Sequence, residues 1–168
     1  MSGVKIRTDN AASVLAGLSR LSKMDVLVGI PEANAVREDG EELNNAEIGY
    51  LQATGATVSL GGREVTLPPR PFLDIGIEDS EKETSLHLKA AAGMALDGDF
   101  AGAERELTGA GQLASDAAKR VISDGDRLIP ISDMTKARRR EQGLPGEKPL
   151  YAHGYLLRSI TYVVRGKK

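Results

Sequence analysis

The stretch Asn45–Ile77, NAEIGYLQATGATVSLGGREVTLPPRPFLDIGI, decides the expected fold, because signals for a helix, a turn and an extended segment follow one another in it. Its first residues place Ile48 and Leu51 on one face at helical spacing. Asn45 is expected to be the N-cap of this helix, and Gly55 is expected to stop it. The stretch therefore opens with a short amphipathic helix.

A β-hairpin is predicted next. Two short β-prone runs, Thr57–Leu60 and Glu64–Leu67, flank the pair Gly61 and Gly62. Both central residues of the favoured two-residue turn need positive φ, which glycine adopts without steric cost. The glycine pair is therefore expected at the tip of the hairpin, followed by Arg63.

A proline-rich segment, Pro68–Leu73 (PPRPFL), follows the hairpin. Its three prolines fix φ and remove three amide donors, so the segment is predicted to be extended and to be neither helix nor central strand. It is expected to carry Phe72 into a core. A long helix is predicted to begin after it, near Glu78.

Helical spacing recurs on both sides of this stretch. An N-terminal helix is predicted to end near Ser22 and to bury one apolar stripe. That stripe consists of Val14, Leu15, Leu18 and Leu21. A second helix is predicted over 78–96, with a capping box formed by Ser80 and Glu83. A third is predicted over 100–123, where Gly109 and Gly111 leave a break open.

The remaining strand signals complete an α+β pattern. Asp25–Ile30 (DVLVGI) is predicted to be a strand buried on both faces, and Ser159–Arg165 (SITYVVR) is a second strand. Val4–Arg7 is a further short candidate. With the hairpin, these predict a mainly antiparallel sheet of four to five strands, packed by the N-terminal helix and one or two long helices.

The length of 168 residues predicts a single α+β domain over 1–168. Two polar segments, 32–44 and 132–149, are predicted to be long exposed loops. Gly154–Arg158 is predicted to turn into the last strand, and 166–168 to form a flexible tail.

The composition points away from an enzyme. The chain has no Cys, which excludes disulfides, thiolate nucleophiles and cysteine metal sites. His87 and His153 lie 66 positions apart with no acids at ligand spacing, and no phosphate-binding loop or nucleophile elbow is present. We therefore expect no catalytic residues, no cofactor and no metal site.

No membrane signal is present in the sequence. An apolar run of the roughly 20 residues that a membrane helix needs is lacking, as is the apolar core of a secretory signal. We therefore expect no membrane partner.

Charge is unevenly distributed along the chain. Residues 1–31 carry four basic and two acidic side chains, net +2. Residues 32–135 carry nine basic and 20 acidic side chains, net −11, and residues 136–168 carry nine basic and two acidic, net +7. An acidic body joined to a basic end can associate with further copies or with complementary surfaces, while solvated faces remain the simpler interpretation.

A second pattern near the C-terminus supports a family resemblance. The proline-rich segment, with Pro69, Arg70, Pro71, Phe72 and Leu73, resembles the "Ile-Gly…Gly…Pro-x-Arg-Pro-Phe-Leu" run of head–tail joining (neck, or tail-completion) proteins of tailed bacteriophages. The C-terminal Pro149-Leu150 and the later Gly154, Leu156, Ser159 and Tyr162 resemble the family's "Pro-Leu", turn and "Ser-Ile-x-Tyr-x-Val" pattern. Here Ala152-His153 stand where relatives carry Asp-Thr. The resemblance covers about residues 24–165.

The resemblance implies a structural virion protein rather than an enzyme. Such proteins form homo-oligomeric rings, expected here with six or twelve copies, at the head–tail junction or the head-proximal end of the tail. The implied partners are further copies, the portal or adaptor protein, and the tail-tube or tail-terminator protein. Genomic DNA would pass through the lumen without specific binding. The implied location is the virion, with the host cytoplasm during assembly.

Exposed loops would supply the contacts in such a ring. The expected contact residues are Arg138, Arg139 and Arg140 in the basic loop and Gly61, Gly62 and Arg63 in the hairpin. Two alternatives remain open. The protein could be a tail-tube terminator, or, in a different class, a nucleic-acid-binding module that acts through the arginine run.

Overall fold

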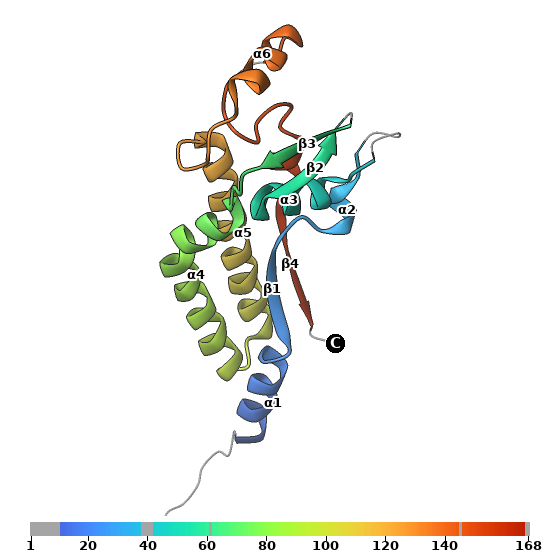
Figure 1. The fold of residues 1–168 in the computed structure, drawn as a ribbon. Coiled ribbons are helices and arrows are strands. Elements are labelled where there is room, and N and C mark those ends of the chain that lie inside the picture. The colour runs from blue at the N-terminus through green and yellow to red at the C-terminus, as the bar shows by residue number, and fades with distance from the viewer. Residues whose placement is uncertain (1–10, 38–41, 61, 145, 167–168) are drawn as a thin grey trace, which may run out of the picture.

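The computed structural model describes residues 11–37, 42–60, 62–144 and 146–166. Figure 1 shows an elongated molecule with α1 at one end and α6 at the other. In chain order the elements are α1 (Ala11–Leu21), β1 (Met24–Gly29), α2 (Glu32–Ala35), α3 (Asn45–Thr54), β2 (Ala56–Leu60), β3 (Arg63–Leu67), α4 (Phe72–Leu96), α5 (Phe100–Asp124), α6 (Asp133–Glu141), α7 (Tyr155–Ser159) and β4 (Thr161–Gly166).

Helices α4 and α5 form the long axis of the molecule (Figure 1). They are joined at Asp97-Gly98-Asp99, where the sequence predicted a break, and Asp99 caps α5 by accepting a hydrogen bond from the Gly102 amide over 2.8 Å. The inward side of α5 is rich in Ala and Gly, which lets neighbouring backbones approach closely. The sequence left open a break at Gly109 and Gly111, but α5 runs through both without one. These glycines make room for side chains of neighbouring elements, and Gly111 faces the ring of Tyr162.

Strands β1 and β4 form an antiparallel ribbon that packs on α5 (Figure 1). In its register Val26 pairs with Val164 and Leu27 with Val163. Because side chains alternate across a strand, one face of the ribbon points to the helices and the other away from them. Val26 and Val164 pack against the buried cluster of α4 and α5, whereas Leu27 is 42% exposed. The prediction that this strand is buried on both faces is therefore wrong.

The predicted hairpin is confirmed as β2 and β3, which pair antiparallel from Ala56↔Leu67 to Leu60↔Arg63. Helix α3 leads into it and ends at Gly55, as predicted, with φ of 76°. The helix is capped one residue earlier than predicted. Asn44 accepts hydrogen bonds from the amides of Ala46 and Glu47, and Glu47 accepts one from the Asn44 amide.

The prediction of one sheet of four to five strands is wrong. The described residues form two separate sheets of two strands each, β1–β4 and β2–β3, within an α+β fold dominated by helices. Alternation predicts which residues are strands, but pairing depends on what each strand packs against. The ribbon β1–β4 covers α5. The hairpin follows α3 in the chain and lies in a different part of the molecule (Figure 1). The candidate strand Val4–Arg7 lies outside the described residues.

Helix α4 begins at Phe72 rather than near Glu78. Pro71 occupies the N-cap position, and its carbonyl accepts the Ile75 amide over 3.0 Å, so the prolines end where the helix starts. The predicted capping box at Ser80 is wrong as well. Ser80 is buried two turns into the helix, where its hydroxyl donates to the Gly76 carbonyl over 2.9 Å.

Short helices replace parts of the predicted loops. Segment 132–149 contains α6, whose cap Ser132 accepts the Thr135 amide over 3.3 Å. Segment 32–44 begins with α2, and residues 38–41 lie outside the described residues, as do 167 and 168 of the predicted tail. The predicted turn at Gly154–Arg158 is helix α7. The sequence missed these helices because each is short, and only tertiary contacts favour it over a turn.

The apolar stripe of the N-terminal helix is buried only in part. Helix α1 contacts α4 through Gly17, where no side chain separates it from the Ala95 carbonyl. Leu21 packs against the core, but Leu15 is 66% and Leu18 43% exposed. The helix thus lies at the end of α4 with half of its stripe open.

Candidate partner-binding surfaces

Arg70 is an internal anchor rather than a surface residue. Its side chain is buried, and its guanidinium donates to the carbonyls of Ile129 (2.6 Å) and Pro130 (3.1 Å) and to Oε1 of Gln52 (3.1 Å). All three acceptors are neutral. Burial lowers the pKa of Arg70, and the charge of nearby Arg139 lowers it further. Arg70 therefore holds α3 and the segment before α6 together.

The two patterns behind the family resemblance meet in one core. Phe72, at the start of α4, belongs to the same buried cluster as Leu156 and Ile160, which lie more than 80 positions later in the chain. Gly49 of α3 lies against both the Phe72 ring and Leu156. Of the other residues in these patterns, Leu73 packs against this cluster, Gly154 and Ser159 are buried, Pro71 and Tyr162 are half-buried, and Pro69 is exposed.

The three consecutive arginines of α6 have three different environments. Arg138 is exposed. Arg139 donates to the Lys148 carbonyl over 2.8 Å, and burial lowers its pKa. Arg140 forms an ion pair with Glu147, which also lies 3.7 Å from Lys136. Arg139 and Arg140 therefore anchor α6 to the segment that follows it, whereas Arg138 faces solvent.

The hairpin tip is open where the structure describes it. Gly62 has a φ of 77°, and a Cβ built there would meet nothing within 4 Å. Gly61 and the side chain of Arg63 lie outside the described residues, so their predicted role as contact residues is a proposal only. In Figure 1 the hairpin lies in the half of the molecule that also carries α6.

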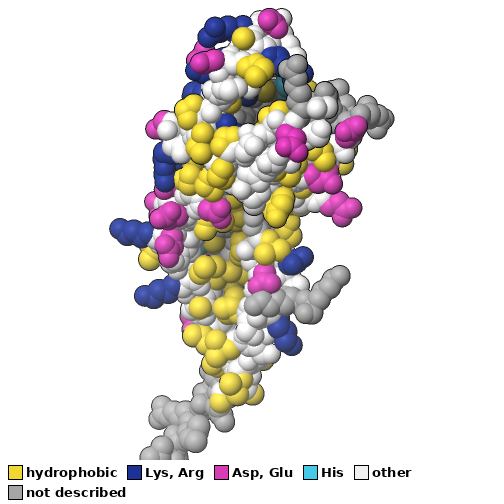
Figure 2. All heavy atoms as spheres, viewed as in Figure 1, with side chains coloured by type: hydrophobic (Ala, Val, Ile, Leu, Met, Phe, Trp, Pro, Cys, Tyr) yellow, Lys and Arg dark blue, Asp and Glu magenta, His cyan; other side chains and the backbone are white. Residues whose placement is uncertain are grey.

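An apolar strip follows the outer face of the β1–β4 ribbon. Leu27 and Val163 pair across the strands and are 42% and 37% exposed, and Leu15 and Leu18 of α1 are exposed beside the start of the ribbon. Figure 2 shows hydrophobic side chains over this region with most charged side chains at its margins. We call the pair Leu27 and Val163 the apolar strip. Among the described residues, each strand of the ribbon also pairs on one edge only.

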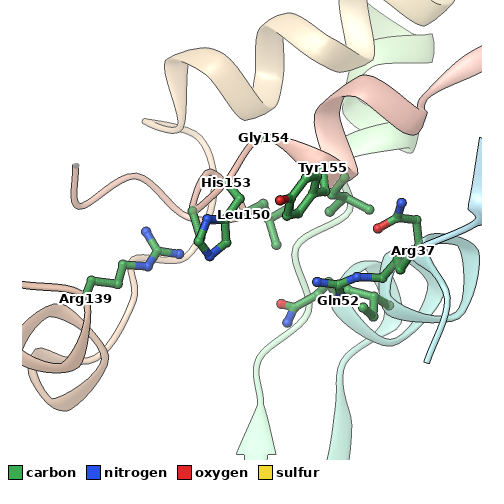
Figure 3. Close-up of a pocket in the computed structure, with 11 residues that line it drawn as sticks. Arg37, Gln52, Arg139, Leu150, His153, Gly154 and Tyr155 are labelled. Atoms are coloured by element: carbon green, nitrogen blue, oxygen red, sulfur yellow. The ribbon is translucent and has the colours of Figure 1, made fainter. Parts of the chain in front are cut away.

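A cavity of about 150 Å³ opens between α3, α6 and the segment that leads into α7. Figure 3 shows Arg139 directed toward His153 on one side, with Arg37, Gln52 and Tyr155 on the other. Leu150, at its wall, has a φ of 61°, which is uncommon for a branched side chain. The sequence analysis missed this site because its residues come from four separated segments and have no characteristic spacing.

No group of three His, Cys, Asp or Glu residues in the described part of the chain could hold a metal ion. His87 instead pairs with Glu106 over 2.6 Å between α4 and α5. Within the same residues, none of the helices combines the length and apolar character needed to span a bilayer.

No protein-family model, curated protein or solved structure matches this chain.

Proposed function

We propose that this protein is a structural subunit of a tailed-bacteriophage virion, which assembles into a ring at the head–tail junction or at the head-proximal end of the tail. The proposal begins from the resemblance of two sequence patterns to the head–tail joining proteins. In this chain both patterns contribute to a single core, with Phe72, Leu156 and Ile160 in one cluster. Two sequence patterns that define a family are expected to meet in the fold, as the proline-rich segment and the C-terminal pattern do here.

The apolar strip is the observation that carries the assembly part of this proposal. Leu27 and Val163 expose an apolar pair on a ribbon of only two strands, whose outer edges have no strand partner among the described residues. Open edges and exposed apolar pairs favour association with another chain. If copies associate through two different surfaces, the contacts are heterologous, and such contacts close into a ring when the rotation between successive copies adds up to a full turn.

Helix α6 would reach toward a neighbour in such a ring. It lies at the far end of the molecule from α1 (Figure 1), and Met134 is 82% exposed on it. Arg140, Lys136 and Glu147 tie the helix to the following segment, so it is presented in a defined orientation. A rigid projection with one apolar side chain is suited to contact with an adjacent subunit or with the next ring in the tail.

Binding of nucleic acid through the arginine run is the weaker proposal. A phosphate-binding surface needs several free cations in a row. Arg139 and Arg140 are instead engaged by Lys148 and Glu147, and only Arg138 of the three is exposed without a hydrogen-bond acceptor among the described residues. Replacing all three arginines with Ala is expected to weaken assembly or docking and to leave DNA binding at physiological salt unchanged.

The experiment that tests the proposal is the solution mass of the purified protein by light scattering, followed by negative-stain imaging of any large species. Closed rings with a central hole support the proposal and give the symmetry. For a monomeric result, capture by purified portal and tail-tube proteins is measured next. A monomer that captures neither protein contradicts the proposal. Capture by the tail-tube protein alone favours the tail-terminator alternative.

A further inference from the structure

The cavity beside Tyr155 is lined by hydrogen-bond donors and cations but by no carboxylate. Its wall includes Arg37, Arg139 and His153, and no Asp or Glu is among the lining residues that the structure describes. Arg70 lies behind Gln52 and adds a further buried guanidinium whose three acceptors are all neutral. Cations gathered in a partly buried site repel one another unless an anion joins them.

Gln52 is held with its amide nitrogen free. Its Oε1 accepts the Nη1 donor of Arg70 over 3.1 Å, which fixes the orientation of the side-chain amide. The two N–H donors on the other end of the amide have no acceptor among the described residues, and Gln52 lines the cavity. Arg70 thereby presents a pair of neutral donors to whatever occupies this space.

Asn45 adds a second amide to the same cavity. The residue as a whole is 5% exposed, and it lines the cavity. It makes no side-chain hydrogen bond to any residue that the structure describes. No buried side-chain nitrogen or oxygen of the described residues lacks a hydrogen-bond partner, so the Asn45 amide reaches solvent at the cavity and can bind a group that enters it.

Two arginine side chains, Arg37 and Arg158, lie over the ring of Tyr155 at the rim of the cavity. The guanidinium carbons of Arg37 and Arg158 lie 5.8 Å and 5.1 Å from the centre of its ring, and the ring of His153 stacks on it at 5.4 Å. Arg158 also donates to the His153 carbonyl over 3.2 Å, which fixes this corner. In Figure 3 Arg139 points into the site from the opposite side.

We propose that this cavity binds the carboxylate of an acidic side chain from a second copy of the chain. The inference rests on the proposed function, because a ring places one surface of each copy against a different surface of the next. Planar guanidinium and amide donors match the two oxygens of a carboxylate, which can accept from both at once. The cavity of about 150 Å³ holds one such side-chain head.

The chain itself provides the complementary charge. Residues 32–135 carry a net charge of −11, and the first half of α4 exposes several carboxylates. Asp74, Glu78 and Glu81 have no ion-pair partner among the described residues, and Asp74 and Glu78 are four residues apart, a spacing at which like charges repel. A duplex DNA backbone would need a row of cations on an open surface, whereas this site is a single recess.

Zero-length crosslinking tests the proposal directly. The substitution Arg37→Lys places an amine at the cavity, which a carbodiimide couples only to a carboxylate in contact with it. The variant is prepared in ¹⁴N and ¹⁵N forms, which are mixed before coupling, and crosslinked peptides are identified by mass spectrometry. We expect peptides that join position 37 of one isotopic form to an acidic residue of the other.

The matched control is Arg120→Lys, at an exposed position of α5 outside the cavity. Equal yields of crosslinks between copies from positions 37 and 120 would overturn the proposal, and so would crosslinks confined to one isotopic form or no crosslink at all. Loss of the crosslink when mixed-sequence duplex DNA is added at physiological salt would identify phosphate as the occupant and also overturn it.

A second variant, Gln52→Glu, separates loss of carboxylate binding from loss of folding, because it is expected to lower the crosslink yield while stabilising the fold. The new carboxylate would occupy the site from within and pair with Arg70, so the thermal midpoint should rise. In the Arg37→Lys background it should reduce the crosslink between copies by about tenfold. An unchanged yield together with the higher midpoint would overturn the inference. Rings that form without any crosslink at position 37 would overturn this inference alone and leave the proposed function standing.

Discussion

Gly76 of α4 lies directly against the backbone of Ala118 in α5. A Cβ at position 76 would come under 3.0 Å from the Cα and the amide nitrogen of Ala118, closer than real Cβ atoms approach such atoms. The two longest helices therefore cross where one of them has no side chain. This contact sets how near α4 and α5 can lie, and with it the position of Phe72 one turn earlier.

Gly76→Ala is expected to destabilise the protein by about 1–3 kcal/mol, because overpacking must move one helix away from the other. Gly93→Ala in the same helix is the control. A Cβ there meets nothing within 4 Å, so the change should stabilise the helix by up to about 1 kcal/mol. Urea denaturation measures both, and similar effects at the two positions would contradict the close crossing.

Phe72→Ala is expected to cost about 3–5 kcal/mol, because the ring is fully buried in the cluster with Leu156 and Ile160. Ile77→Ala in the same helix provides the comparison. Ile77 is 46% exposed, so its truncation should cost much less. Thermal and chemical denaturation give both values. A loss below about 1 kcal/mol for Phe72 would mean that the proline-rich segment is an interaction surface instead.

Arg70→Lys is expected to cost at least about 2 kcal/mol, even though it keeps the charge. A single ammonium does not reach Gln52, Ile129 and Pro130 together, and each buried acceptor left without a donor costs about 1–3 kcal/mol. Protease cleavage between α5 and α6 should also become faster. Arg138→Lys on exposed α6 should change neither property, and a stable, protease-resistant Arg70→Lys protein would contradict the anchoring role.

Acidification is expected to loosen the attachment of α6. Hydrogen bonding to Arg140 holds the pKa of Glu147 below its usual range, and the charge of Lys136 contributes. A depressed folded-state pKa means that this attachment is fully present above the ordinary glutamate range and is lost as the pH falls through the lower, folded-state value. Hydrogen exchange of α6 amides against pH measures it. Glu147→Gln should remove the dependence, and an unchanged pH profile in that variant would refute the assignment.

Leu27→Lys and Val163→Lys are each expected to reduce assembly without unfolding the subunit, because both side chains lie on the outer face of the ribbon. A new charge in the apolar strip must be desolvated on association, which is unfavourable. Leu86→Lys on α4, where the side chain is 61% exposed, is the matched surface control. Light scattering compares the three variants. Assembly that survives both strip variants would exclude the strip from the interface.

Local sequence signals predicted the elements with strong, nearby causes. Gly55 ends α3 and Gly62 lies in the turn of the hairpin, because both positions require a positive φ that glycine adopts readily. Residues 97–99 separate α4 from α5, as expected. The start of α4 was misplaced because the prolines were taken to exclude a helix through Phe72. Proline is excluded from a helix interior but not from the residues that precede its first turn, where the amides have no helical acceptor.

The docking surfaces were harder to predict. The arginine run of α6 was visible in the sequence. Which of the three arginines binds Lys148, which pairs with Glu147 and which faces solvent depends on how the following segment folds back. The cavity beside Tyr155 had no sequence signal at all. Arg37, Gln52, Arg139 and His153 reach it from separate segments, and spacing along the chain says nothing about their proximity.

The sequence by itself determined four of the helices (α1, α3, α4 and α5), the hairpin, the absence of thiol chemistry and the acidic and basic division of the chain, since all of these follow from local propensity and composition. Only the tertiary structure decided that the strands form two small sheets, that Arg70 is buried on neutral acceptors, and that an apolar pair and a cationic cavity remain open. The physical reason is that pairing, burial and unmet hydrogen-bonding capacity belong to contacts between distant segments, which no local pattern specifies.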